Sequence, residues 1–164
     1  MPLFCVSICL AVEGRPTVGV VYDPTRGELF TARAGEGAEL DGRPIHKPRP
    51  ARLEECLVMI ALAQRGWRDR ERAILRAVRA RRDLGSAALS LAYVADGRFD
   101  LLVQTRGLSI WDVAAAGLIA AEAGATVSDV RGGPWLDLAT PPRGVQVVAA
   151  PPALHSELLR LLAA

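Results

Sequence analysis

The sequence predicts a layered α/β fold: an antiparallel strand meander followed by an α/β sheet with helices packed on it. Three observations support this prediction. Short apolar runs separated by Gly and Pro turns fill residues 1–50. Over residues 51–164, strand-like and helix-like patterns alternate. The segment 110–123 lacks proline and is apolar on nearly every side of a helix, which is typical of an interior helix. We therefore expect two parts, 1–50 and 51–164.

The first part is expected to contain three antiparallel strands, at 3–12, 17–22 and 28–33. The turns between them are marked by Gly14, Pro16, Pro24 and Gly27. Residues 34–52 hold further Gly and Pro turn signals and one short extended piece around 38–40. This pattern predicts a meander.

In the second part, the predicted order is strand 57–62, helix 69–81, helix 86–95, strand 99–104, the interior helix, strands 125–130 and 145–149, and a closing helix to about residue 162. Helix 69–81 rests on the spacing of Ile74, Leu75 and Val78. Gly124 is placed to end the interior helix as a C′ residue.

Composition limits the class of protein. Hydrophobic residues make up 51% and charged residues 23% of the 164 residues, which excludes a disordered chain. The net charge of +2 implies no polyanionic partner, and we expect no nucleic acid. No 18-residue apolar run lacks a charge, so no membrane span is expected. The three cysteines give no disulfide framework, and a cytoplasmic location is expected.

Asp112 lies in the first turn of the interior helix. The positive end of the helix dipole favours an anion there, and a metal site could form. The spacing Ser109-Ile110-Trp111-Asp112 also fits a capping box, in which Ser109 and Asp112 bond to each other's backbone N–H groups. The residues alone leave both roles open.

Several motifs together resemble one family. Trp-Asp-Val-Ala-Ala-Ala-Gly at 111–117, followed by Ala-Glu-Ala-Gly-Ala at 121–125, is similar to the second signature of the inositol monophosphatase family, the Mg²⁺-dependent sugar phosphatases. The similarity extends over the whole chain, through 18–24, 27–33, 35–38, 42–45, 85–88 and 129–135. It implies a C-terminal part of that family's fold.

The resemblance also implies a site. Asp112 would hold Mg²⁺, while Gly85, Ser86, Ala87 and Thr105 would contact the alcohol part of a small phosphate ester. Inositol-specific members carry Glu where this chain has Thr105, so the resemblance does not imply inositol itself. From the residues alone, the favoured interpretation of Ser86 is an ordinary helix N-cap that follows a Gly hinge.

The family's first signature, Asp-Pro-x-Asp-Gly-Thr, and an upstream Glu-Glu pair do not occur in the chain. We therefore expect metal-dependent phosphomonoester hydrolysis only in a longer form, and a truncated, inactive chain here. The alternative is a stand-alone pseudoenzyme that acts as a binding or dimerisation module. An uncovered strand 3–12 predicts a homo-oligomer.

Other polar and aromatic residues receive structural interpretations. Residues 65–83 hold eight arginines against three acidic residues, which we interpret as a solvated helix face rather than a nucleic-acid patch. His46 and His155 are expected at the surface, and Trp111 and Trp135 in the core. Asp23 and Asp41 are expected to bond backbone groups in turns.

Overall fold

The first sheet is the predicted meander. The computed structural model describes residues 3–45, 50–62, 67–139 and 141–163. Neighbouring strands pair antiparallel in the order β1-β2-β3-β4-β5. Their bounds are β1 (Val6–Val12), β2 (Arg15–Asp23), β3 (Glu28–Arg33), β4 (Gly37–Leu40) and β5 (Arg43–Pro44). Glu13 and Gly14 both have positive φ, 51° and 76°, as a two-residue hairpin turn between twisted strands requires.

The second sheet is mixed, in the order β7-β6-β8-β10-β9. Strand β6 pairs parallel with β7 and β8, whereas β10 pairs antiparallel with β8 and β9. A 3₁₀ turn, η1 (Leu53–Glu55), precedes it. The strands are β6 (Leu57–Ala61), β7 (Ala80–Arg82), β8 (Leu101–Ser109), β9 (Thr126–Ser128) and β10 (Arg143–Ala150).

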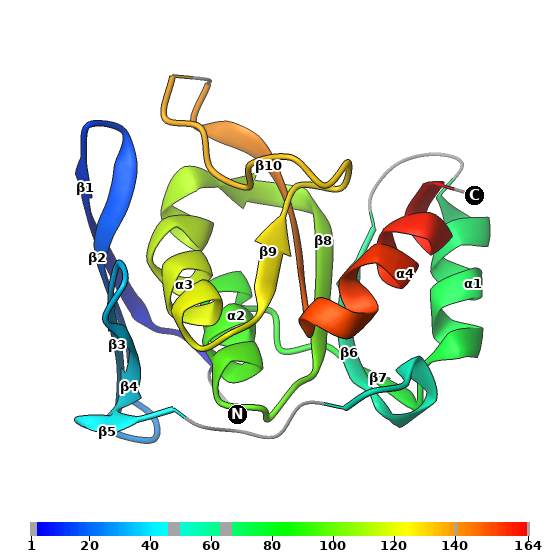
Figure 1. Cartoon of the computed structure of the whole chain (residues 1–164), viewed down its shortest axis with the longest axis horizontal. Coiled ribbons are helices and arrows are strands. Elements are labelled where there is room, and N and C mark those ends of the chain that lie inside the picture. Colours follow the sequence, from blue (N-terminus) through cyan, green and yellow to red (C-terminus); the bar gives the residue numbers. More distant parts are fainter. Residues whose placement is uncertain (1–2, 46–49, 63–66, 140, 164) are drawn as a thin grey trace.

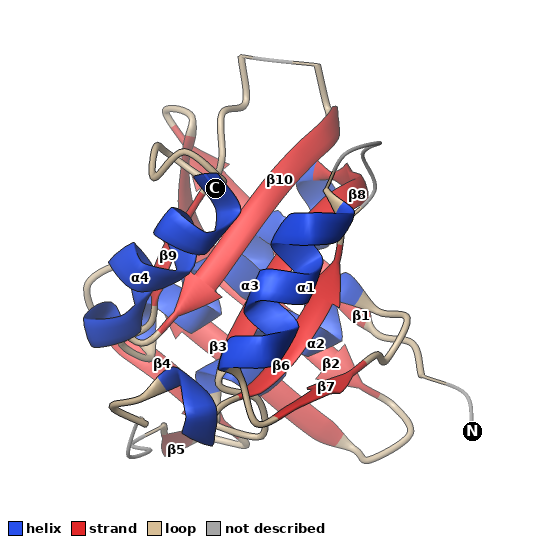
Figure 2. Cartoon of the chain, turned by 90° about the vertical axis from the view of Figure 1, so that its right-hand side faces the viewer, coloured by secondary structure: helices blue, strands red, loops and turns tan. Residues whose placement is uncertain are grey.

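Four helices complete the layers. They are α1 (Arg68–Ala77), α2 (Ala87–Ala95), α3 (Ile110–Glu122) and α4 (Pro152–Ala163). Helices α2 and α3 lie between the two sheets (Figure 1). Helices α1 and α4 cover the far face of the second sheet, on the side that faces the viewer in Figure 2. The predicted layered α/β fold is confirmed.

Nearly all the buried residues of α2 and α3 belong to one apolar core, which explains why these helices are hydrophobic on nearly every side. One core fills the space between the sheets and the other lies under α1 and α4. Strand β2 approaches α3 closely at Gly19, where a Cβ would lie 2.8 Å from the carbonyl oxygen of Ala115. A sheet on either side buries both faces of α3, which confirms the prediction of an interior helix.

The helix predicted over 69–81 is too long. Helix α1 ends at Ala77, Val78 is extended, and the backbone N–H of Arg79 donates to the carbonyl of Cys56 at 3.0 Å. The chain then pairs with β6 as the short parallel strand β7. Leu75, predicted to face inward, is 36% exposed. Strand pairing along an existing edge therefore outweighs the helical spacing at this end.

The predicted burial of two side chains was wrong: Trp111 was expected in the core and His155 at the surface. Trp111 is 54% exposed because the first turn of α3 lies at the surface. His155 is buried, since α4 packs on the second sheet and the Nε2 of His155 lies 2.8 Å from the Ser128 hydroxyl. That hydroxyl donates to the carbonyl of Asp129, so Nε2–H of His155 is the donor. Burial lowers the pKa of His155.

Strand bounds also shift. The predicted strand 3–12 begins at Val6, and the strand predicted to end at 104 continues to Ser109, where α3 follows directly. The first sheet ends before residue 50 and the second begins after it, but α2 and α3 contact both, so a division into 1–50 and 51–164 stays a prediction. His46 lies outside the described residues. Among those described, no helix is long and apolar enough to span a membrane.

Candidate functional site

An open cleft lies where the N-terminal ends of α2 and α3 meet the start of β1. It has a volume of about 460 Å³. Its walls come from three segments that are far apart in the sequence: Leu3, Phe4, Cys5, Ser7, Gly85, Ser86, Ala87, Ala88, Trp111 and Asp112. The fold thus brings Asp112 together with Gly85, Ser86 and Ala87, four of the five predicted site residues.

Asp112 forms the cap that its sequence context allowed, and it also lines the cleft. Its Oδ2 accepts the backbone N–H of Ser109 at 2.7 Å, which is one half of the predicted capping box. The side chain is half-buried and lines the cleft. The cap therefore fixes the orientation of the carboxylate and still leaves acceptor capacity on its second oxygen.

Gly85 and Ser86 shape the opposite wall. Gly85 has φ +74°, which reverses the chain before α2, and its N–H donates to Asp83 Oδ1 at 3.1 Å. Ser86 is the N-cap of α2, and its hydroxyl accepts the N–H of Leu89 at 3.4 Å. The first N–H groups of α2, at Ala87 and Ala88, have no partner within the helix and lie at the cleft.

Both helices present their positive dipole ends to this cleft. Helix α2 has 9 residues and α3 has 13, so each has a full set of N-terminal N–H groups. Such ends attract anions. The arrangement suits an anionic ligand near α2 and a carboxylate at the start of α3.

Thr105 does not line the cleft. It is buried on β8. The preceding residue, Gln104, does reach a smaller hollow of about 80 Å³ that shares Gly85, Ser86 and Ala87 with the cleft. The role of Thr105 therefore stays a prediction.

The start of β1 and the segment before it supply cleft residues that the sequence alone did not indicate. Cys5 Sγ lies 3.9 Å from the Ser86 hydroxyl, and the Ser7 hydroxyl donates to the carbonyl of Trp111 at 3.3 Å. Burial raises the pKa of Cys5, so it remains a thiol at neutral pH. Cys5 is free, in agreement with the expectation of no disulfide framework, and it connects the segment before β1 to the start of α2.

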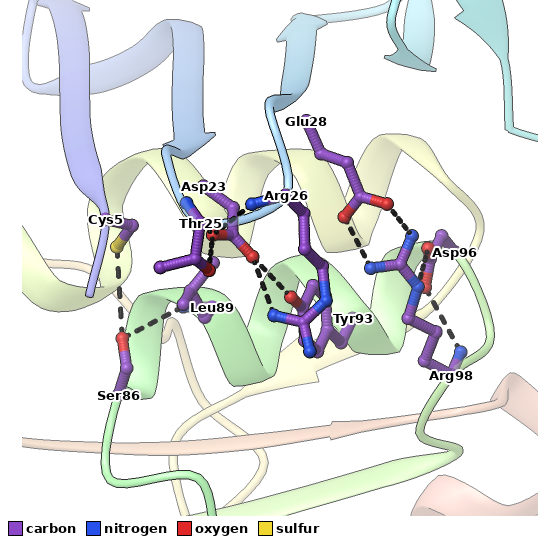
Figure 3. A network of polar contacts seen from close by, with 10 residues as sticks. All are labelled: Cys5, Asp23, Thr25, Arg26, Glu28, Ser86, Leu89, Tyr93, Asp96 and Arg98. Atoms are coloured by element: carbon purple, nitrogen blue, oxygen red, sulfur yellow. Dashed lines mark hydrogen bonds and ion pairs between the residues drawn. The ribbon is translucent and has the colours of Figure 1, made fainter. Parts of the chain in front are cut away.

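A polar network anchors the first sheet on α2 and so positions the cleft (Figure 3). Its centre is Asp23 at the end of β2, whose side chain is fully buried. Asp23 accepts the backbone N–H of Thr25 at 2.9 Å, the Tyr93 hydroxyl at 2.6 Å and Arg26 Nη1 at 3.1 Å. The predicted turn bonding of Asp23 is confirmed, and its contact with α2 is an addition.

These contacts control the charge state of the network. Burial acts to raise the pKa of Asp23, but hydrogen bonds from Thr25, Tyr93 and Arg26 outweigh it and lower the pKa to about 2. Burial and the bond to Asp23 raise the pKa of Tyr93 to about 12. Asp23 is therefore an anion and Tyr93 a neutral donor at neutral pH.

A second group of polar contacts joins the C-terminal end of α2 to the first sheet. Arg98, just beyond α2, forms a two-pronged ion pair with Glu28 at 2.6 and 2.7 Å and also contacts Asp96 at 2.8 Å (Figure 3). Its guanidinium carbon lies 4.6 Å from the centroid of the Tyr93 ring. Together the two anchors join the β2–β3 turn to Tyr93 near the end of α2 and to Arg98 just beyond it.

The described residues offer one ligand for a divalent cation rather than a full coordination shell. Within them, no three His, Cys, Asp or Glu side chains gather in a way that could hold a metal. Mg²⁺ takes one or two protein carboxylates together with water and substrate oxygens. Asp112 fits one such position, and no reaction step follows from it alone.

Comparisons with known proteins agree with this geometry. The family model "Inositol monophosphatase family" matches residues 1–164. The chain is 43% identical over 138 residues to Nus factor SuhB of Xylella fastidiosa, covering 80% of the chain and 50% of that protein. It is 42% identical over 142 residues to inositol monophosphatase 2 of Solanum lycopersicum, covering 80% and 52%.

Solved structures show the same fold. The extragenic suppressor protein suhB of Bartonella henselae superposes with a TM-score of 0.88 at 35% identity, over 99% of this chain and 65% of that one. The IMPase of Thermotoga maritima gives 0.84 at 30% identity, over 97% and 60%. The chain thus spans about half the length of the curated relatives that it matches. On these matches, the chain belongs to the inositol monophosphatase family.

Proposed function

We propose that this chain supplies one metal ligand and the alcohol-binding wall of a Mg²⁺-dependent phosphomonoesterase site. The substrate class is the phosphate ester of a sugar, inositol or related alcohol. One observation carries the proposal: Asp112 and residues 85–87, which lie on different helices, face the same cleft. Family membership supports it, since relatives of similar sequence are named inositol monophosphatases.

In this proposal, each side of the cleft has a distinct task. The N–H groups at the start of α2 and the Ser86 hydroxyl bind oxygens of the ester, because they are donors at a positive helix end. Asp112 holds the cation in a fixed direction, because Ser109 restrains its other oxygen. When bound, Mg²⁺ supplies charge neutralisation on the phosphate and activation of a water molecule.

The identity of the alcohol is left broad for a physical reason. Thr105 is buried outside the cleft, and it is neutral and shorter than the glutamate of inositol-specific members, so nothing at this position selects inositol. The substrate therefore includes other sugar, nucleotide or amino-alcohol phosphates.

A second candidate is a binding or dimerisation module without turnover. Among the described residues, Asp112 is the only acidic side chain that lines the cleft, and the opposite face of the first sheet is apolar and exposed. Both candidates expect the 164 residues by themselves to release no phosphate. They differ in whether the cleft binds an ester.

Amide NMR shifts test the proposal directly. Adding glucose 1-phosphate with Mg²⁺ is expected to shift the signals of residues 85–88 and 112 in a saturable manner. Ser86→Ala should weaken this binding, while Ser156→Ala, an exposed serine on α4, should not. If the shifts occur elsewhere, or if there are none, the proposed ester site is wrong and the binding or dimerisation module remains. Phosphate release that Asp112→Asn abolishes would show that the chain is an enzyme by itself.

A further inference from the structure

A second hollow, here called the side hollow, adjoins the cleft at the start of α3. It has a volume of about 250 Å³, and Ser7 and Trp111 line both the cleft and the side hollow. The rest of its wall includes Cys9 on β1, Ala114 on α3, and Leu136 and Leu138 in the segment between β9 and β10. The fold therefore places the side hollow directly beside the candidate site, with Trp111 at the border between them.

The side hollow differs from the cleft in its chemistry. The cleft is polar, because Asp112 and the first N–H groups of α2 border it. None of the described residues that line the side hollow carries a charge. The Ser7 hydroxyl donates to the carbonyl of Trp111 at 3.3 Å. The Cys9 thiol donates to the carbonyl of Leu10 at 3.6 Å. Since both groups have a partner within the chain, the side hollow suits an apolar group that forms no hydrogen bond.

Trp111 offers the surface that such a group would contact. Its side chain is 54% exposed, and that of Leu138 is 37% exposed. Two hydrogen bonds hold the first turn of α3 in place, one from Ser7 to the carbonyl of Trp111 and one from the N–H of Ser109 to Asp112. Aromatic rings that stack on each other gain more than burial of their area alone provides. Adjacent residues of one restrained turn thus carry the carboxylate of the cleft and an aromatic surface of the side hollow.

From this arrangement we infer that the side hollow binds an apolar ring carried by the alcohol part of the phosphate ester. The inference rests on the proposed function, because the phosphate and the hydroxyl groups of the ester would occupy the cleft. Pockets for whole small ligands have volumes of about 300–1,000 Å³, so a hollow of about 250 Å³ takes one ring system and not a complete ligand. The occupant is therefore an ester with a polar end and an apolar end, and aryl phosphates are the simplest members of that class.

A pair of matched esters tests the inference. Phenyl phosphate and methyl phosphate carry the same anionic group, but only the first carries a ring. Each is titrated with Mg²⁺ into the full 164-residue chain and followed by NMR. Phenyl phosphate is expected to bind about tenfold more tightly, because its ring is buried against Trp111. It should also shift the indole N–H signal of Trp111 and the amide signals of residues 136–138, which methyl phosphate should leave in place.

Variants of the side hollow locate the ring. In Trp111→Ala and in Leu138→Ala, the ratio of the two dissociation constants should fall towards one, because the surface that contacts the ring is smaller. Leu75→Ala on α1 is the matched control, since Leu75 and Leu138 are 36% and 37% exposed, and it should leave the ratio unchanged. Circular dichroism checks that all three variants fold.

The outcomes separate this inference from the proposed function. If glucose 1-phosphate and methyl phosphate bind at the cleft but phenyl phosphate binds no more tightly than methyl phosphate, the inference is wrong and the proposed function stands. If no ester binds, both are wrong. An advantage of phenyl phosphate that persists in Trp111→Ala and Leu138→Ala would place the ring elsewhere. Phenol that binds as tightly as phenyl phosphate would show that the side hollow acts independently of the ester site, which also contradicts the inference.

Discussion

Asp23 and Asp112 are two carboxylates of the same fold that differ in how many hydrogen bonds they accept. Asp23 is fully buried and accepts bonds from a hydroxyl, a phenol, a guanidinium and backbone N–H groups. Asp112 is half-buried and accepts one N–H bond, from Ser109. A carboxylate with all its acceptor capacity used stabilises the fold, whereas one with spare capacity at a cleft can bind a ligand.

The largest expected effect on stability follows from removing the side chain of Asp23, which accepts the larger number of hydrogen bonds. Asp23→Ala leaves Tyr93 and Arg26 without their partner and should lower the free energy of unfolding by about 3 kcal/mol. Urea unfolding measures this change. The control Asp69→Ala removes an exposed side chain on α1 and should have little effect. Equal losses in both variants would contradict the comparison.

The second-largest expected effect is a loss of stability at low pH, which comes from protonation of Asp23. Its pKa in the folded chain is about 2, below its ordinary value of 3.8, so its stabilisation is present above pH 3.8 and is lost as the pH falls through about 2. The loss amounts to about 2 kcal/mol. Unfolding measured at pH 4 and pH 2 should show a steeper decline in the wild type than in Asp23→Asn. Parallel curves would assign the acid sensitivity to other groups.

A smaller change is expected at the wall of the cleft. Ser86→Ala removes the N-cap of α2 and should cost about 0.5–1 kcal/mol, since its bond to the Leu89 N–H is long. Thermal unfolding, with Ser156→Ala as the control, measures it. A loss of unfolding free energy as large as that of Asp23→Ala would mean that Ser86 stabilises the fold as strongly as the buried network of Asp23 does.

The smallest effect on stability is expected at Asp112. In Asp112→Asn, the side-chain carbonyl can still accept the Ser109 N–H, so only the favourable charge at the helix start is lost. The cost is about 0.5 kcal/mol or less. Unfolding by urea should therefore separate it clearly from Asp23→Ala. A cost of several kcal/mol would make Asp112 a structural residue.

The fold was predictable where one local pattern dominates. Segment 110–123 is apolar on nearly every side and is followed by Gly124, and it forms an interior helix as expected. Strand β7 was missed because its three residues, 80–82, include two arginines and show no apolar alternation. Its conformation depends on pairing with β6, a contact that no local pattern contains.

The site was predictable only in part. Motifs on α2 and α3 identified Asp112 and residues 85–87, and the fold places them at one cleft. Cys5 and Ser7 were missed because alternation shows which residues point inward, but not that this inward face borders the cleft. Burial of His155 likewise depends on a distant partner, Ser128.

Binding of Mn²⁺ as a paramagnetic substitute for Mg²⁺ tests the central claim most directly. If Asp112 is a metal ligand in the cleft, low Mn²⁺ concentrations should selectively broaden the amide signals of residues 85–88 and 109–113. Asp112→Asn should abolish this broadening, and Asp69→Asn should not. Uniform broadening, or selective broadening that persists in Asp112→Asn, would contradict the account.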